Sequence, residues 1–425
     1  MRIFLLGLAL PLVACDGKTT DSASEDTSPP TDTSTASPDT GSTEDTDTAS
    51  PTTDSDTDTG TDTATGDADL DEDGYSASAD CDDSDAYTYP GAAELCDGIQ
   101  NDCDDTAWTD DNGLATYYSD TSAIPQDITA EVGGGTASLP TAYDFSDDGA
   151  VHFCEGTWYI NADLTADLTV RGIGDREQVI LHGARHTVFT IDGPYTVALE
   201  NLTATGSNSY GNIFITSADV TIRDAVIRDG YSEGTAAGLY IHGGSLLLDG
   251  VDVLNNEGAC YYSSCYGGGG VLARYSTIEV TDSYFSGNSA IDMAGGGLLA
   301  DESFLTVQNS VFEDNESTFA GGGVALTDGS TATLTDCVFE GNDALSYAGG
   351  LLVDKSEATM TDCSFTANSA AAVGGAAVIS RSSTLTLETC DFAENTPEDL
   401  YNSDLSEGYD LGESASYTCD NSGCY

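Results

Sequence analysis

The sequence predicts an all-β protein whose largest part is a solenoid of at least eight coils. Three observations predict it. Phenylalanines that open a Phe-x-x-Asn tetrapeptide recur every 26 or 27 residues between 285 and 395. Glycine doublets or triplets recur in the same rhythm, and short apolar alternations such as Leu305-Thr306-Val307 lie between them. A fixed period of this length indicates stacked repeats, and period-two runs broken by Gly and Asn indicate strands rather than helices.

The first fifteen residues, MRIFLLGLALPLVAC, have the pattern of an export signal. One Arg precedes an apolar run that is too short to span a bilayer. The run ends Leu12-Val13-Ala14-Cys15, which resembles the lipobox of bacterial lipoproteins. The resemblance implies removal of residues 1–14 and attachment of lipid to Cys15, and an ordinary secretory signal is the alternative. We therefore expect a chain tethered by lipid to the cell envelope, at the outer-membrane surface of a Gram-negative bacterium.

Residues 15–68 are expected to form a disordered stalk. From residue 19 onward the segment consists almost entirely of Thr, Ser, Asp, Pro, Gly and Ala, with no hydrophobic residue larger than Ala. Such a composition cannot bury enough apolar surface to offset the entropy lost on ordering.

Residues 69–80, DLDEDGYSASAD, fill the ligand positions of an EF-hand-like calcium loop. That loop needs oxygen ligands at positions 1, 3 and 5, a backbone carbonyl at 7, a carboxylate at 12 and Gly at 6. The predicted ligands are Asp69, Asp71, Asp73, the carbonyl of Tyr75, and Asp80. The similar acidic run 54–63 does not fit the calcium-loop pattern, because Thr59 stands at the glycine position and Thr65 at the last ligand position. The sequence therefore predicts a structural Ca²⁺ in residues 69–80 and none in residues 54–63.

The residues that follow resemble the metal-binding motif of myxobacterial and related surface proteins. The resemblance is carried by Asp80-Cys81-Asp82-Asp83, by residues 90–98 (PGAAELCDG) and by Asn101-Asp102-Cys103-Asp104. Gln100 and Asp105 depart from the motif, which has Asp and Gly there. The resemblance implies a metal-binding motif over residues 69–106, and the two departures leave open a second ion at Asp97, Asn101, Asp102 and Asp104. An acidic, disulfide-held knot without a specific metal is the alternative.

The repeat frame extends backwards from the Phe-x-x-Asn coils. Equivalent apolar positions are Leu199, Ile222, Leu248, Val280, Val307, Leu334, Met360 and Leu387, with an insertion at 258–270. This pattern resembles the right-handed parallel β-helix family, of pectate-lyase-like fold, and its Phe-x-x-Asn and Gly-Gly repeats are similar to those of polymorphic outer-membrane proteins. The resemblance implies a right-handed parallel β-helix over residues 115–396, followed by a cap over 397–425.

Two internal ladders are expected. Phe285, Phe312, Phe339, Phe365 and Phe392 should stack inside as one column. Asn288, Asn315, Asn342, Asn368 and Asn395 should sit at a turn in the left-handed conformation, with amides bonded to the next coil. An acid or amide precedes each coil's Phe strand, at Asp224, Asp249, Asp282, Asn309, Asp336 and Asp362. We expect these side chains to form a solvated row, although such a row could also recruit cations.

Twelve cysteines include Cys15, so the eleven others cannot all pair within the chain. Cys260 with Cys265 and Cys419 with Cys424 are the predicted local disulfides. Cys337, Cys363 and Cys390 occupy one repeat position and are expected to be buried free thiols. The connectivity of Cys81, Cys96, Cys103 and Cys154 stays open.

The charge excludes some partners. The chain has 74 acidic residues against 10 basic ones, a formal net charge of −64. Nucleic acid is not an expected partner, because neutralising phosphates needs Lys and Arg. Three functions stay open: adhesion or binding of an extracellular glycan or surface protein, polysaccharide lyase or glycoside hydrolase activity, and a coat without a ligand. The predicted β-helix contains few basic residues, and they form no recognisable catalytic motif, so we favour binding. They are Arg223, Arg228, Arg274, Lys355 and Arg381.

Overall fold

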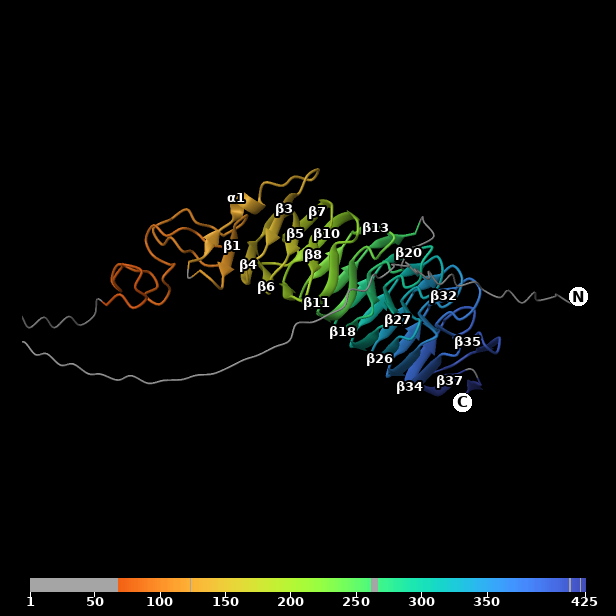
Figure 1. Ribbon diagram of the computed structural model, residues 1–425. Helices are drawn as coiled ribbons and strands as arrows, with labels where there is room; N and C mark the ends of the chain where they lie inside the picture. Colours follow the sequence, from red (N-terminus) through yellow and green to blue (C-terminus); the bar gives the residue numbers. More distant parts are fainter. Residues whose placement is uncertain (1–67, 123, 261–266, 413, 421) are drawn as a thin grey trace, which may run out of the picture.

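The computed structural model describes residues 68–122, 124–260, 267–412, 414–420 and 422–425. The predicted signal, Cys15 and the stalk to residue 67 lie outside these residues, as does Cys265. The described chain forms an elongated solenoid of about nine turns with almost no helix (Figure 1). The acidic motif lies at one end and the C-terminus at the other. Within the described residues, no helix is long and apolar enough to cross a membrane.

The N-terminal end of the solenoid is closed by a short α/β segment. Its elements are β1 (Ala115–Ser119), β2 (Gln126–Asp127), α1 (Thr129–Val132), β3 (Thr141–Phe145), β4 (Gly149–Cys154), β5 (Gly156–Leu164) and β6 (Leu168–Ile173). Strand β1 pairs antiparallel with β4, whereas β3 with β5 and β4 with β6 are the first parallel pairs.

The next coils combine strands of three residues with strands of up to eleven. They are β7 (Val179–Arg185), β8 (Phe189–Asp192), β9 (Thr196–Glu200), β10 (Thr203–Ser209), β11 (Ile213–Arg223), β12 (Val226–Arg228), β13 (Tyr231–Glu233), β14 (Leu239–Asp249), β15 (Asp252–Leu254) and β16 (Glu257–Ala259). Each strand pairs parallel with its counterpart one coil further on, as β11 does with β14.

Four short strands make up each later coil. They are β17 (Val271–Arg274), β18 (Thr277–Thr281), β19 (Tyr284–Ser286), β20 (Ser289–Ile291), β21 (Leu298–Asp301), β22 (Phe304–Gln308), β23 (Val311–Glu313), β24 (Glu316–Ser317), β25 (Val324–Thr327), β26 (Thr331–Thr335), β27 (Val338–Glu340), β28 (Asp343–Ala344), β29 (Leu351–Asp354), β30 (Glu357–Thr361), β31 (Ser364–Thr366), β32 (Ser369–Ala370) and β33 (Ala377–Ser380).

The C-terminal end is closed by antiparallel strands. After β34 (Thr384–Ala393) come β35 (Leu400–Asn402), β36 (Glu407–Tyr409), β37 (Ala415–Asp420) and β38 (Gly423–Cys424). Strand β35 still pairs parallel with β33, so the stack extends beyond the expected boundary at residue 396. Strands β36 and β37 then pair antiparallel with β35 and β34. The predicted Cys419–Cys424 disulfide is present in this cap.

The predicted internal columns form the core. The apolar frame from Leu199 to Leu387 is in register from coil to coil and at most 2% exposed. The five phenylalanines stack with ring centroids 4.6–5.1 Å apart. Cys337, Cys363 and Cys390 are buried free thiols beside them. Period-two alternation places these side chains inside because successive residues of a strand face opposite sides.

The asparagine ladder differs from its prediction in one respect. The amides do bond from coil to coil, as from Asn315 Nδ2 to Asn342 Oδ1 at 3.0 Å. The left-handed conformation, however, belongs to the preceding residue, as in Asp314 (φ 51°) and Gly341 (φ 65°). The asparagines themselves are buried, because an inward amide can satisfy the backbone groups that the turn leaves without partners.

The row of turn acids also needs one correction. Asp224, Asp282, Asn309, Asp336 and Asp362 are exposed, with φ of 47–53°. In the coil that contains Asp249 the equivalent position is Gly250 (φ 65°), because Asp249 ends β14 opposite Arg223. A side chain at this position points to solvent, so Asp and Gly both satisfy the turn.

Candidate metal centre

The acidic motif, residues 69–106, is attached covalently to the solenoid. Cys96 forms a disulfide with Cys154, the last residue of β4. The backbone N–H of Cys96 donates to Thr116 Oγ1 at 2.8 Å, and its carbonyl lies 3.2 Å from His152 Nδ1. A second disulfide joins Cys81 to Cys103 inside the motif. The pairing that the sequence left open is therefore one bond within the motif and one to the β-solenoid.

The predicted calcium loop is held by its own first carboxylate. Asp69 Oδ1 accepts from the N–H of Glu72 at 2.7 Å, and Asp69 Oδ2 accepts from the N–H of Gly74 at 3.1 Å. Gly74 has φ 101°, a conformation that residues with a side chain rarely adopt. The glycine at position 6 thus lets the chain wrap around the carboxylates. Tyr75, the next residue, donates its N–H to Asp73 Oδ1 at 2.7 Å.

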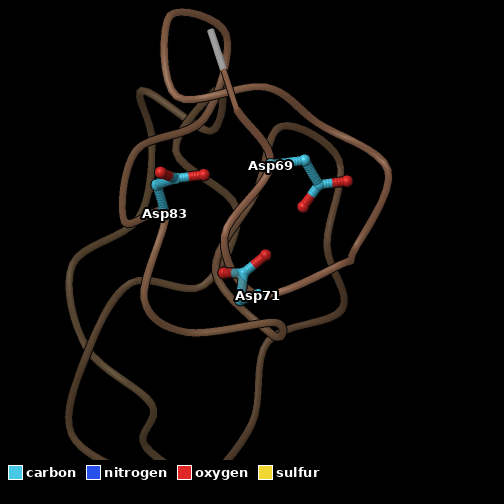
Figure 2. A group of neighbouring side chains, drawn as sticks. All are labelled: Asp69, Asp71 and Asp83. Atoms are coloured by element: carbon cyan, nitrogen blue, oxygen red, sulfur yellow. The ribbon is translucent and has the colours of Figure 1, made fainter. Parts of the chain in front are cut away.

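Two groups of three carboxylates form in this loop. In the first, oxygens of Asp71, Asp73 and Asp80 all lie within 4.8 Å of one another, and in the second the same holds for Asp69, Asp71 and Asp83. Figure 2 shows the second group, with its three side chains directed toward a common space. Asp71 belongs to both groups.

Asp83 was not among the predicted ligands, because it lies beyond the twelve-residue loop that the spacing rule describes. Its Oδ1 accepts from the N–H of Leu70 at 3.0 Å, which folds residues 80–83 back over the start of the loop. The signal that could have identified it is the pair of acids that follows Cys81.

Three oxygens of the first group are buried without partners. Oδ2 of Asp71, Asp73 and Asp80 has no hydrogen bond and almost no solvent contact. Burial raises the pKa of Asp71 above its usual value, and the nearby charges of Asp73, Asp80 and Asp69 raise it further, although the N–H of Asp73 acts in the opposite direction. Buried carboxylate oxygens without a donor are costly unless a cation neutralises them.

Comparison with known families gives two matches. A family model described as "Right handed beta helix region" matches residues 176–318, 261–392 and 318–421, together more than half of the chain. The chain belongs to the right-handed β-helix family. A second model, described as "Putative metal-binding motif", matches residues 80–107. No curated protein and no solved structure matches the chain significantly.

The carboxylate groups of this β-helix protein have the ligand chemistry of a hard cation. Both groups offer carboxylate oxygens only, and the nearby Cys81 is held in a disulfide. Oxygen ligands of this kind bind Ca²⁺, Mg²⁺ or Mn²⁺, whereas copper prefers imidazole and sulfur. The residues that would hold the ion are Asp71, Asp73 and Asp80, with Asp69 and Asp83 beside them.

Three of the residues predicted for a second ion make hydrogen bonds within the motif. Asn101 is buried and accepts from the N–H of Leu95 at 2.8 Å, while its Nδ2 donates to Asp97 Oδ2 at 3.2 Å. Asp102 Oδ1 accepts from the N–H groups of Gly91 and Asp104 at 2.7 and 3.0 Å. Among the described residues, the grouped carboxylates all lie between Asp69 and Asp83.

Gln100, which departs from the metal-binding motif, is also held by hydrogen bonds. Its Nε2 donates to the carbonyls of Asp102 and Asp105, both at 2.6 Å. An amide nitrogen thus occupies the space between two carbonyl oxygens, where a carboxylate could not donate.

The basic residues weighed as catalytic bases lie in ion pairs. Arg228 lies 3.6 Å from Glu177 and 3.8 Å from Asp229. Arg274 pairs with Asp301 at 2.8 Å and Lys355 with Asp328 at 2.5 Å. Arg381 pairs with Asp354, which is fully buried. Arg223 is held as loosely as Arg228, with carboxylates at 3.5 and 3.9 Å.

Proposed function

We propose that this protein is a lipid-anchored component of the cell envelope that presents a rigid, acidic β-helix for binding an extended glycan or a surface protein. Calcium is the structural cation of its N-terminal motif in this proposal. The single observation that carries the metal part is the set of three buried, unpartnered oxygens on Asp71, Asp73 and Asp80. The anchor is inferred from the lipobox resemblance of residues 12–15.

The cation has a mechanical role in this proposal. The motif lies between the stalk and the first coil, and the Cys96–Cys154 bond transmits its rigidity to β4. A bound Ca²⁺ would neutralise the mutual repulsion of the Asp carboxylates and fix the loop in one conformation. The β-helix would then leave the stalk at a defined joint rather than a flexible one.

The β-helix supplies the binding surface. Its outward positions repeat from coil to coil, so that Thr306, Thr333, Thr359 and Thr386 form one external row. A solenoid presents such rows as a long regular face, suited to an extended ligand. A lyase or hydrolase would instead need an acid or base poised near neutral pH, and the ion pairs of Arg274, Lys355 and Arg381 favour structural roles for these side chains.

The metal part is tested by titration of the full chain with Ca²⁺ and with Tb³⁺. Luminescence of Tb³⁺ can be excited through Tyr75, which lies inside the loop and stacks on Tyr89 at 5.1 Å. Asp73→Asn should abolish the tightest site. Asp82→Asn is the matched control, because Asp82 is exposed and outside both carboxylate groups. Equal effects of the two variants would contradict the site.

The binding part is tested by a screen of acidic and neutral polysaccharides with Ca²⁺ present. The retention of the protein by each polysaccharide is measured together with the ultraviolet absorbance of unsaturated products. Retention without turnover supports the proposal, turnover would replace it with a lyase, and neither would favour a coat without a ligand.

A further inference from the structure

One hollow on the solenoid collects a large share of the protein's few positive charges. The described part of the chain contains eight Arg and Lys residues. Three of them, Arg171, Arg176 and Arg223, line a hollow of about 610 Å³ together with Glu200, Asn201 and Asp224. We call it the arginine hollow. Its arginines are unexpected in a chain of such negative charge.

The strand register builds one wall of the arginine hollow. Arg171 on β6 lies opposite Glu200 on β9, and Glu200 lies opposite Arg223 on β11. Arg171 Nε and Nη2 donate to Glu200 Oε2 at 2.9 and 2.5 Å. One carboxylate therefore stands between two guanidinium groups, whose side chains are 49% and 45% exposed.

Arg223 retains unused donors. Its nearest carboxylate atoms are Asp249 Oδ2 at 3.5 Å and Glu200 Oε1 at 3.9 Å, longer than ordinary N–H···O hydrogen bonds. Glu200 is already engaged by Arg171. The planar guanidinium presents its donors in a fork that matches a carboxylate or a sulfate.

Arg176 forms another, rigid wall of the hollow. It lies in the loop between β6 and β7 and reaches forward along the solenoid, where Nη2 pairs with Asp252 at 2.5 Å and Nη1 donates to the Gly250 carbonyl at 3.1 Å. Its own carbonyl accepts from Thr203 Oγ1 at 2.8 Å. The wall is thus held in place before any ligand arrives, which lowers the entropic cost of binding.

The surface beside the arginine hollow is rich in hydroxyl groups. A smaller depression of about 180 Å³ crosses β9, β11, β14 and β18, and is lined by Thr196, Thr221, Ser245, Thr277, Asp219 and Glu279, among others. Thr221 and Arg223 face the same side of β11, because they are two residues apart on one strand. Hydrogen-bonding side chains thus continue from the arginines across the sheet.

We propose that the arginine hollow binds an oxyanion, a carboxylate or a sulfate ester, carried by a saccharide whose hydroxyl groups lie over β9, β11 and β14. The inference rests on the proposed function, because it names the ligand chemistry of the β-helix face. Arg223 and Arg171 hold the oxyanion, and Arg176 is a positioning residue that keeps the wall in place.

The test is calorimetric titration of the full chain, in Ca²⁺ and at about 0.15 M ionic strength, where charges beyond the contact are largely screened. Three oligosaccharides of matched length serve as probes: one carboxylated, one sulfated and one neutral. We expect an anionic probe to bind about tenfold or more tightly than the neutral one, and Arg223→Gln to remove that difference. The carboxylated and sulfated arms identify which oxyanion is preferred.

Lys355→Gln is the matched control, because it removes one positive charge from an exposed ion pair on a distant coil. It should leave binding unchanged. Equal weakening by both variants, or no binding of either anionic probe, would overturn the inference. The arginines of the hollow would then serve only in structural ion pairs. Binding of all three probes that Arg223→Gln does not alter would also overturn it, while leaving the proposed glycan binding intact.

Discussion

Asn342 Oδ1 accepts two hydrogen bonds from Asn315 on the preceding coil, one from the side-chain Nδ2 at 3.0 Å and one from the backbone N–H at 3.1 Å. Asn342 Nδ2 in turn donates to the carbonyl of Phe312 at 2.8 Å. Each rung of the ladder therefore satisfies buried groups of its neighbour.

Asn342→Ala should destabilise the β-helix by about 3 kcal/mol or more, because several buried donors and acceptors lose their partners at about 1–3 kcal/mol each. Urea unfolding measures the change. Thr333→Ala, at an exposed position of β26, should change stability by less than about 0.5 kcal/mol. Similar losses in both variants would show that the ladder contributes little.

The thiols of Cys337, Cys363 and Cys390 should resist alkylation until the protein unfolds. All three are buried, and the hydrogen bond with Cys337 raises the pKa of Cys363 to about 12. The thiolate is the reactive form. The hydrogen bond with Cys363 lowers the pKa of Cys337, against the effect of burial, so burial is the protection that all three thiols share. Mass mapping of iodoacetamide adducts before and after denaturation gives the answer. Rapid labelling of the native column would contradict its buried placement.

His152 should make the junction of the motif and β4 weaker in acid. Burial lowers the pKa of His152 below its ordinary 6.5, against the effect of its hydrogen bond with the Cys96 carbonyl; nearby Arg171 lowers this pKa and Asp97 raises it. Because the unfolded chain takes up the proton first, this contribution is complete above about pH 6.5 and is lost as the pH falls toward the folded-state pKa.

The measurement is the urea midpoint between about pH 7.5 and pH 5, compared with that of His152→Gln. The native protein should lose more stability over this range than the variant. Parallel curves would assign the pH dependence to other groups.

Opening the Cys81–Cys103 bond should weaken metal binding by about tenfold or more, because Asp80 and Asp83 flank Cys81 and would lose their fixed positions. The double variant Cys81→Ser/Cys103→Ser is titrated with Ca²⁺. Cys419→Ser/Cys424→Ser is its control at the far end of the chain. If the two double variants retain equal affinity, the disulfide does not organise the site.

Periodicity made the coil frame predictable. The spacing of Val280, Val307 and Leu334 alone assigns them to one inward column, because each coil repeats the same geometry. The same spacing cannot tell which residue of a turn takes a positive φ, since Asp314 and Gly341 serve equally well beside a buried Asn.

The metal loop was predictable only within its local spacing rule. Asp69, Asp71, Asp73 and Asp80 lie in one short segment, whereas Asp83 joins them through a fold-back that no local pattern describes. The Cys96–Cys154 pairing and the arginine hollow depend on coil-to-coil neighbours far apart in sequence. Such contacts follow from three-dimensional stacking, not from local composition.

The antiparallel cap has a consequence for solubility. A parallel stack ends in strands whose N–H and C=O groups invite another chain to add on. Here β37 covers β34 and β36 covers β35, and at the other end β1 covers β4. These antiparallel strands therefore occupy edges at which another molecule could pair. They oppose the end-to-end association of β-helices into fibres.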